Sequence, residues 1–233
     1  MNNTAQSLRT VATGLGLVYG GLCLFVFSVI WPFLGGLFLG QMGPSGVFFL
    51  FASTPVLMLL AILLDTIGRL LCLAMPADQS GTRPIIYVSL AFSLLPLATS
   101  ALKIGNLFFV LVHLPQVVDQ LQIPLALLGS VLFVIFLKNL AKYVQKPDLA
   151  GRANTVLKVG VVTVVAILGM VVLAVAAQRP EFVQFVGILG LGVFVLLLGT
   201  LVLGIILLIM YGKLLTYLRK AVLQHLATES TAG

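Results

Sequence analysis

The sequence is short of charge. Only 8% of its 233 residues are Asp, Glu, Lys or Arg, whereas 61% are hydrophobic. A soluble domain usually carries roughly a quarter charged residues, which it needs to cover its surface. Instead, uncharged apolar runs of about 20 residues, long enough to cross a bilayer, recur along the whole chain. This composition excludes a soluble globular domain and predicts an all-α integral membrane protein that crosses the bilayer several times.

Groups that carry catalysis are also scarce, with two cysteines, two histidines and six acidic residues in the chain. No H-E-x-x-H, G-x-S-x-G or P-loop motif occurs, and neither C-x-x-C nor zinc-ligand spacing is found. No two carboxylates lie together inside an apolar run, as a membrane hydrolase would require. We therefore expect no enzyme activity, no cofactor and no metal site, and we interpret Cys23 and Cys72 as small packed hydrophobic residues.

The apolar runs predict a single domain of six transmembrane helices. Residues 11–218 form this domain, residues 1–10 a cytoplasmic N-terminal tail, and residues 219–233 a cytoplasmic C-terminal tail whose small polar end is typical of a frayed terminus. Similar sequences at three helix exits raise the hypothesis of three repeated helical hairpins. The predicted spans are Val11 to Trp31, Val47 to Ile67, Pro84 to Leu102, Ile123 to Tyr143, Val156 to Ala177 and Phe182 to Tyr211.

Basic residues gather on one side of this threading. Eleven of the thirteen fall at one end of the spans and only Arg179 falls in a connection at the other, while Lys103 lies near that other end. Short loops rich in Lys and Arg stay in the cytoplasm, so both termini are predicted to be cytoplasmic. Five of these cations form a predicted cytoplasmic basic loop that also attracts anionic lipid headgroups: Lys138, Lys142, Lys146, Arg152 and Lys158. This stretch has few aromatic or polar side chains between its cations that could contact bases, so it does not predict nucleic-acid binding.

The third span carries polar residues on one face. Ser89, Ser93, Ser100 and Lys103 recur, together with Pro96, at spacings of three and four residues, which places them on one side of a helix. Two interpretations are open. In one, the face is a polar lane that ends in a cation and lines a path through the bundle. In the other, the hydroxyls bond to their own helix and Lys103 extends its amine toward the interface.

One pair of opposite charges lies inside the second span. Asp65 and Arg69 are four residues apart, so they share a helix face and are predicted to form an ion pair. Self-neutralisation near the cytoplasmic boundary is the structural interpretation. A gating or coupling role is the functional alternative, because ionisable residues within a span mark functional sites.

Glycines predict close helix packing. Gly16 with Gly20, and Gly36 with Gly40, form two G-x-x-x-G motifs, in which small residues one turn apart let helix backbones approach. Together, these features favour a non-enzymatic multi-pass protein of a cell or inner membrane, acting as a structural or accessory subunit. Its expected partners are other membrane proteins or further copies of itself. The alternative is a small transporter or channel that uses the polar lane of the third span.

Overall fold

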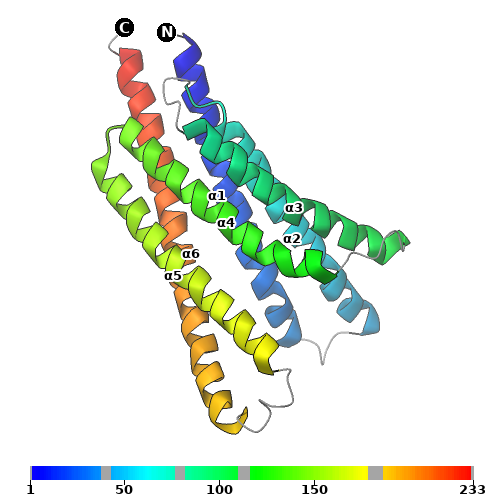
Figure 1. The fold of residues 1–233 in the computed structure, drawn as a ribbon. Coiled ribbons are helices and arrows are strands. Elements are labelled where there is room, and N and C mark those ends of the chain that lie inside the picture. The colour runs from blue at the N-terminus through cyan, green and yellow to red at the C-terminus, as the bar shows by residue number, and fades with distance from the viewer. Residues whose placement is uncertain (1, 38–42, 77–81, 110–115, 178–185, 232–233) are drawn as a thin grey trace.

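The computed structural model describes residues 2–37, 43–76, 82–109, 116–177 and 186–231, and these residues form helices without any strand. The six predicted helices are confirmed, and each extends beyond its predicted apolar run or matches one end of it. Hydropathy detects only the lipid-soluble part of a helix, whereas the backbone hydrogen bonds continue past it. The helices are α1 (Asn2–Leu37), α2 (Pro44–Cys72), α3 (Thr82–Phe109), α4 (Gln116–Tyr143), α5 (Pro147–Ala177) and α6 (Val186–Thr231) (Figure 1).

The helices are arranged as a closed ring. Each helix packs against the next one in the chain, and α6 packs back against α1. The helices converge at the end that holds both termini and diverge toward the other end, where α3 and α6 lie far apart (Figure 1). Both termini therefore lie on one side of the bundle. Which side of the membrane this is, and whether the hairpins are true repeats, stay predictions.

A hydrophobic core fills the convergent end. Large side chains that are fully buried there include Leu8 and Leu15 of α1, Phe136 and Leu140 of α4, and Leu215 of α6. The predicted tails contribute to this core, because α1 begins at Asn2 and α6 continues to Thr231. Helix α6 therefore continues into the C-terminal end that was predicted to be frayed. Leu218, Val222 and Leu226 recur on one face of α6, and burying that face holds the terminal turns in place.

The predicted basic loop is mostly helical. The connection between α4 and α5 consists of residues 144–146, so Lys146 is the one member of the set that lies outside a helix. Lys138 and Lys142 end α4, whereas Arg152 and Lys158 belong to α5, and Lys138 Nζ donates a hydrogen bond to Asn154 Oδ1 over 3.1 Å. The proline that begins α5 disfavours a helical residue before it, which keeps this turn short.

Three glycines bring α1 and α2 into backbone contact. A Cβ atom added to Gly14 would lie 2.6 Å from the carbonyl oxygen of Gly68, and one added to Gly68 would lie 2.7 Å from that of Gly14. One added to Gly21 would lie 2.8 Å from the carbonyl oxygen of Ala61. These separations leave no room for a side chain, so glycine is required for the two helices to pack this closely.

The first predicted G-x-x-x-G motif, Gly16 with Gly20, does not make this contact. Gly16 lies about 200° around α1 from Gly14, and a Cβ there would meet the Arg219 guanidinium of α6 at 3.3 Å. Nothing lies within 4 Å of a Cβ at Gly20, so this glycine packs against no helix in the described part of the chain, and packing against another subunit stays a prediction. Gly36 and Gly40 fall outside the residues whose surroundings are described.

All six helices are long and apolar enough to cross a membrane. The middle part of α6 exposes a broad apolar face that includes Leu201, Val202, Ile205 and Ile209. Water does not favour such a surface, whereas lipid tails do. The architecture is that of a multi-pass integral membrane protein.

Candidate functional site

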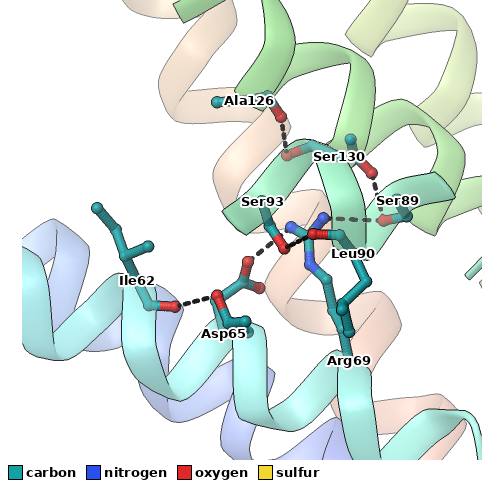
Figure 2. A network of polar contacts seen from close by, with 10 residues as sticks. Ile62, Asp65, Arg69, Ser89, Leu90, Ser93, Ala126 and Ser130 are labelled. Atoms are coloured by element: carbon teal, nitrogen blue, oxygen red, sulfur yellow. Dashed lines mark hydrogen bonds and ion pairs between the residues drawn. The ribbon is translucent and has the colours of Figure 1, made fainter. Parts of the chain in front are cut away.

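An ion pair lies inside the bundle. Asp65 Oδ2 is 2.7 Å from Arg69 Nη2, and the two side chains are only 26% and 6% exposed. Both residues belong to α2, one helical turn apart, as their spacing predicted. Figure 2 shows the guanidinium of Arg69 extending from α2 toward the serines of α3. Since an unpaired charge at this depth would be costly, the carboxylate is needed to hold the cation there.

The guanidinium of Arg69 also links α2 to α3 and α4. Its Nη1 donates a hydrogen bond to Ser89 Oγ over 3.0 Å, and Ser89 Oγ donates in turn to the carbonyl oxygen of Gly129 over 2.7 Å (Figure 2). The guanidinium carbon lies 5.0 Å from the centroid of the buried Phe133 ring, which is within cation–π range. This connection leaves no signal in the sequence, because Ser89 and Gly129 are 40 residues apart and no local pattern relates them.

The polar face of α3 points into the bundle, and its members have different roles. Ser89 is the partner of Arg69, whereas Ser93 donates to the carbonyl oxygen of Leu90 in its own helix over 2.8 Å. Ser100 lines a cavity. Lys103 lies in α3, but its side chain is outside the described residues. Of these serines, Ser100 lines the cavity, whereas Ser89 and Ser93 are bonded to protein partners, and a continuous lane along this face stays a prediction.

The cavity has a volume of about 660 Å³ and lies beside the ion pair. Helices α1 to α4 supply most of its walls, which are largely apolar, and α6 contributes Tyr211. Its polar lining residues come from four helices. They are Asp65 and Arg69 of α2, Ser100 of α3, Ser130 of α4 and Tyr211 of α6. A volume in this range, apolar walls and a few converging polar groups are the usual features of a small-molecule site.

Two polar atoms on the cavity-lining residues are buried without a protein partner. Within the described part of the chain, neither Arg69 Nε nor the hydroxyl oxygen of Tyr211 has a hydrogen-bond partner. A buried donor left unpaired costs roughly 1–3 kcal/mol, and such groups are rare unless they serve a function. Tyr211 was not a candidate from the sequence, where it reads as the interfacial end of an apolar run. Both groups belong to residues that line the cavity, so a rotation of either side chain would bring a further hydrogen-bond donor into an otherwise apolar space.

Comparison of the chain with protein-family models, with curated proteins and with solved structures finds no match. The geometry of the cavity therefore has to support any functional assignment. Among the described residues, no three His, Cys, Asp or Glu side chains lie close enough to share a metal ion. What the cavity offers is one neutralised charge pair, hydroxyl groups and apolar walls.

Proposed function

We propose that this multi-pass membrane protein is a small, non-enzymatic transporter that takes up a small amphipathic solute in the cavity between α1, α2, α3 and α4. The observation that carries the proposal is a cavity of about 660 Å³ whose lining residues include Arg69 and Tyr211, each with a buried polar atom that has no partner among the described residues. Both atoms can donate a hydrogen bond, so they fit a solute that presents an acceptor oxygen.

The charges of the cavity narrow the class of solute. Asp65 already neutralises Arg69 across 2.7 Å, so a solute with a single net charge would leave one charge without compensation. An uncharged polar group or a zwitterion meets no such penalty. The apolar walls, with Phe25, Met58 and Leu127 among them, favour a molecule whose remaining surface is hydrophobic.

The lining residues supply no catalytic pair. Asp65 is the one carboxylate among the described lining residues, and it is paired with Arg69 rather than with a nucleophile. Ser130 donates its hydroxyl to the carbonyl oxygen of Ala126 over 2.9 Å, so that hydroxyl is engaged in its own helix. Activation of a serine needs a neighbouring base, which supports binding and passage of a solute rather than its chemical conversion.

A structural or accessory subunit is the second candidate. It is favoured by the exposed face of α6, where a Cβ at Gly199 or Gly204 would meet nothing within 4 Å. Open glycines on a lipid-facing helix permit the close approach of another helix. In this alternative the protein would be recovered from its native membrane with a stoichiometric partner, and its cavity would have no path to water.

Cysteine labelling tests transport directly. In a background with Cys23→Ser and Cys72→Ala, Ser100→Cys places a thiol on the cavity wall. Ser93→Cys is the matched control, because Ser93 lies on the same helix face, is buried and bonds to its own helix. The reagent is a charged, membrane-impermeant methanethiosulfonate, applied separately to each side of sealed, oriented vesicles.

A transporter exposes its cavity to each side in turn, so Ser100→Cys should react from both sides, and at least about tenfold faster than Ser93→Cys. No reaction, or reaction from one side only, would contradict transport. Purification in mild detergent followed by mass determination then tests the accessory role, since a stoichiometric partner protein would favour it.

A further inference from the structure

A second hollow lies on the outer surface of the ring, between α1 and α6. This α1–α6 groove has a volume of about 550 Å³. Its apolar floor includes Leu22 and Val26 of α1 and Ile209 of α6, and its polar residues include Tyr19, Thr216 and two lysines, Lys213 and Lys220. The groove is separate from the ion pair, because neither Asp65 nor Arg69 lines it.

The two lysines give the groove a positive charge. Lys213 and Lys220 are seven residues apart on α6, which places them on one helix face at a separation of about 10 Å along the axis. No Asp or Glu is among the described residues that line the groove. Both lysines are exposed, and in the described part of the chain neither has an ion pair or hydrogen bond. Both ammonium groups are therefore available to an anion.

A third cation lies next to the same surface. Tyr217 lines the groove, and the guanidinium carbon of Arg152 from α5 lies 5.1 Å from the centroid of its ring. This cation–π contact holds Tyr217 in place and keeps a positive charge beside the groove. One member of the predicted basic loop thus borders a binding surface formed by other helices.

The groove crosses the boundary between lipid tails and headgroups. Lys213 is the first charged residue after the uncharged stretch of α6 that begins at Val186. A lysine at such a boundary extends its amine toward the headgroups while its alkyl chain stays in the apolar layer. Ile209, one turn deeper, is 52% exposed and apolar. One end of the groove therefore suits an anion, and the other suits an acyl chain.

We propose that the α1–α6 groove binds an anionic phospholipid. Its phosphate lies between Lys213 and Lys220, and one acyl chain runs along Leu22, Val26 and Ile209. Free phosphate would use the lysines alone, whereas the lipid also needs the apolar floor. The proposal does not rest on solute transport, although Leu22 lines both the groove and the cavity, and the bound lipid would hold α1 against α6 where the ring closes.

The experiment measures lipid retention by native mass spectrometry on the full-length protein, exchanged into nanodiscs of phosphatidylcholine with and without phosphatidylglycerol. Each lysine near a headgroup should strengthen binding by roughly fivefold, so Lys213→Gln with Lys220→Gln should weaken phosphatidylglycerol retention by about thirtyfold. The control is Lys142→Gln with Lys158→Gln, which removes the same charge from two exposed residues outside the groove. This control pair should retain the lipid within about threefold of the unmodified protein.

The apolar floor is tested by Ile209→Gln, an exposed position at which folding is not at risk. This change should also weaken phosphatidylglycerol retention, and inorganic phosphate should not displace the lipid. Equal retention of phosphatidylcholine and phosphatidylglycerol would overturn the proposal, as would equal losses in the groove pair and the control pair. An effect of the lysines without any effect of Ile209→Gln would likewise contradict a lipid site.

Discussion

Helix α2 contacts its neighbours in two opposite ways through adjacent residues. Gly68 faces α1, where the absence of a side chain brings the two backbones together. Arg69, about 100° further around the helix, faces α3 and α4 and fills the space with the longest polar side chain available. The contact with α1 requires the absence of a side chain at Gly68. The contact with α3 and α4 requires that each buried charge has a partner.

The difference determines what each contact tolerates. The contact between α1 and α2 is held by dispersion over a short distance, so an added methyl group is harmful. The contact of α2 with α3 and α4 buries a cation whose cost is offset by Asp65, Ser89 and Phe133. There, the removal of one partner is harmful because the other charge stays buried.

The largest effect is expected from Arg69→Met, which breaks the polar contact. Met fills similar space but leaves the Asp65 carboxylate without its counter-charge, so the free energy of unfolding should fall by about 3 kcal/mol. Reversible unfolding in mixed micelles measures this loss. Asp65→Leu combined with Arg69→Met removes both charges and should recover most of the stability. If the double variant is no more stable than the single one, the loss does not come from an unpaired charge.

An intermediate effect is expected from Gly68→Ala, which breaks the close contact. The new Cβ would lie 2.6 Å from Val18 Cγ2 and 2.7 Å from the carbonyl oxygen of Gly14, so the helices must separate. Overpacking of this kind costs about 1–3 kcal/mol. Gly20→Ala adds the same methyl group to α1 with nothing within 4 Å, and it should be neutral or slightly stabilising. Equal losses in the two variants would show that helix geometry, rather than contact, requires glycine.

The same two contacts show what the sequence can predict. The scarcity of charge and the apolar runs were enough to predict six helices. The spacing of four residues was enough to predict the ion pair of Asp65 and Arg69. Both features depend on residues that are close in the sequence. The inward face of α3 followed from the spacing of Ser89 and Ser93, which are both buried. Each of these inferences uses residues on a single helix.

Predictions that required a second helix did not succeed as well. The G-x-x-x-G pattern identified Gly16 and Gly20, whereas Gly14 and Gly21, seven residues apart, make the contact with α2. Each pair of glycines leaves part of the α1 surface without side chains. Which pair contacts α2 depends only on where α2 lies. Tertiary packing also determines the hydrogen bond from Arg69 to Ser89 and the proximity of Tyr211 to the cavity. Neither can be inferred from the periodicity of the sequence.

The smallest effect on stability is expected from Tyr211→Phe, which tests a buried polar group beside the ion pair of α2. The Tyr211 hydroxyl oxygen is buried without a partner among the described residues, so removing it takes away a desolvated group and no hydrogen bond. The free energy of unfolding should therefore stay within about 1 kcal/mol of the unmodified value, on the stabilising side. A loss of about 2 kcal/mol would mean that the hydroxyl has a partner in the native protein. Because the described residues supply none, the first candidate for that partner would be a molecule held in the cavity, and mass spectrometry of the purified protein before and after the substitution would detect it.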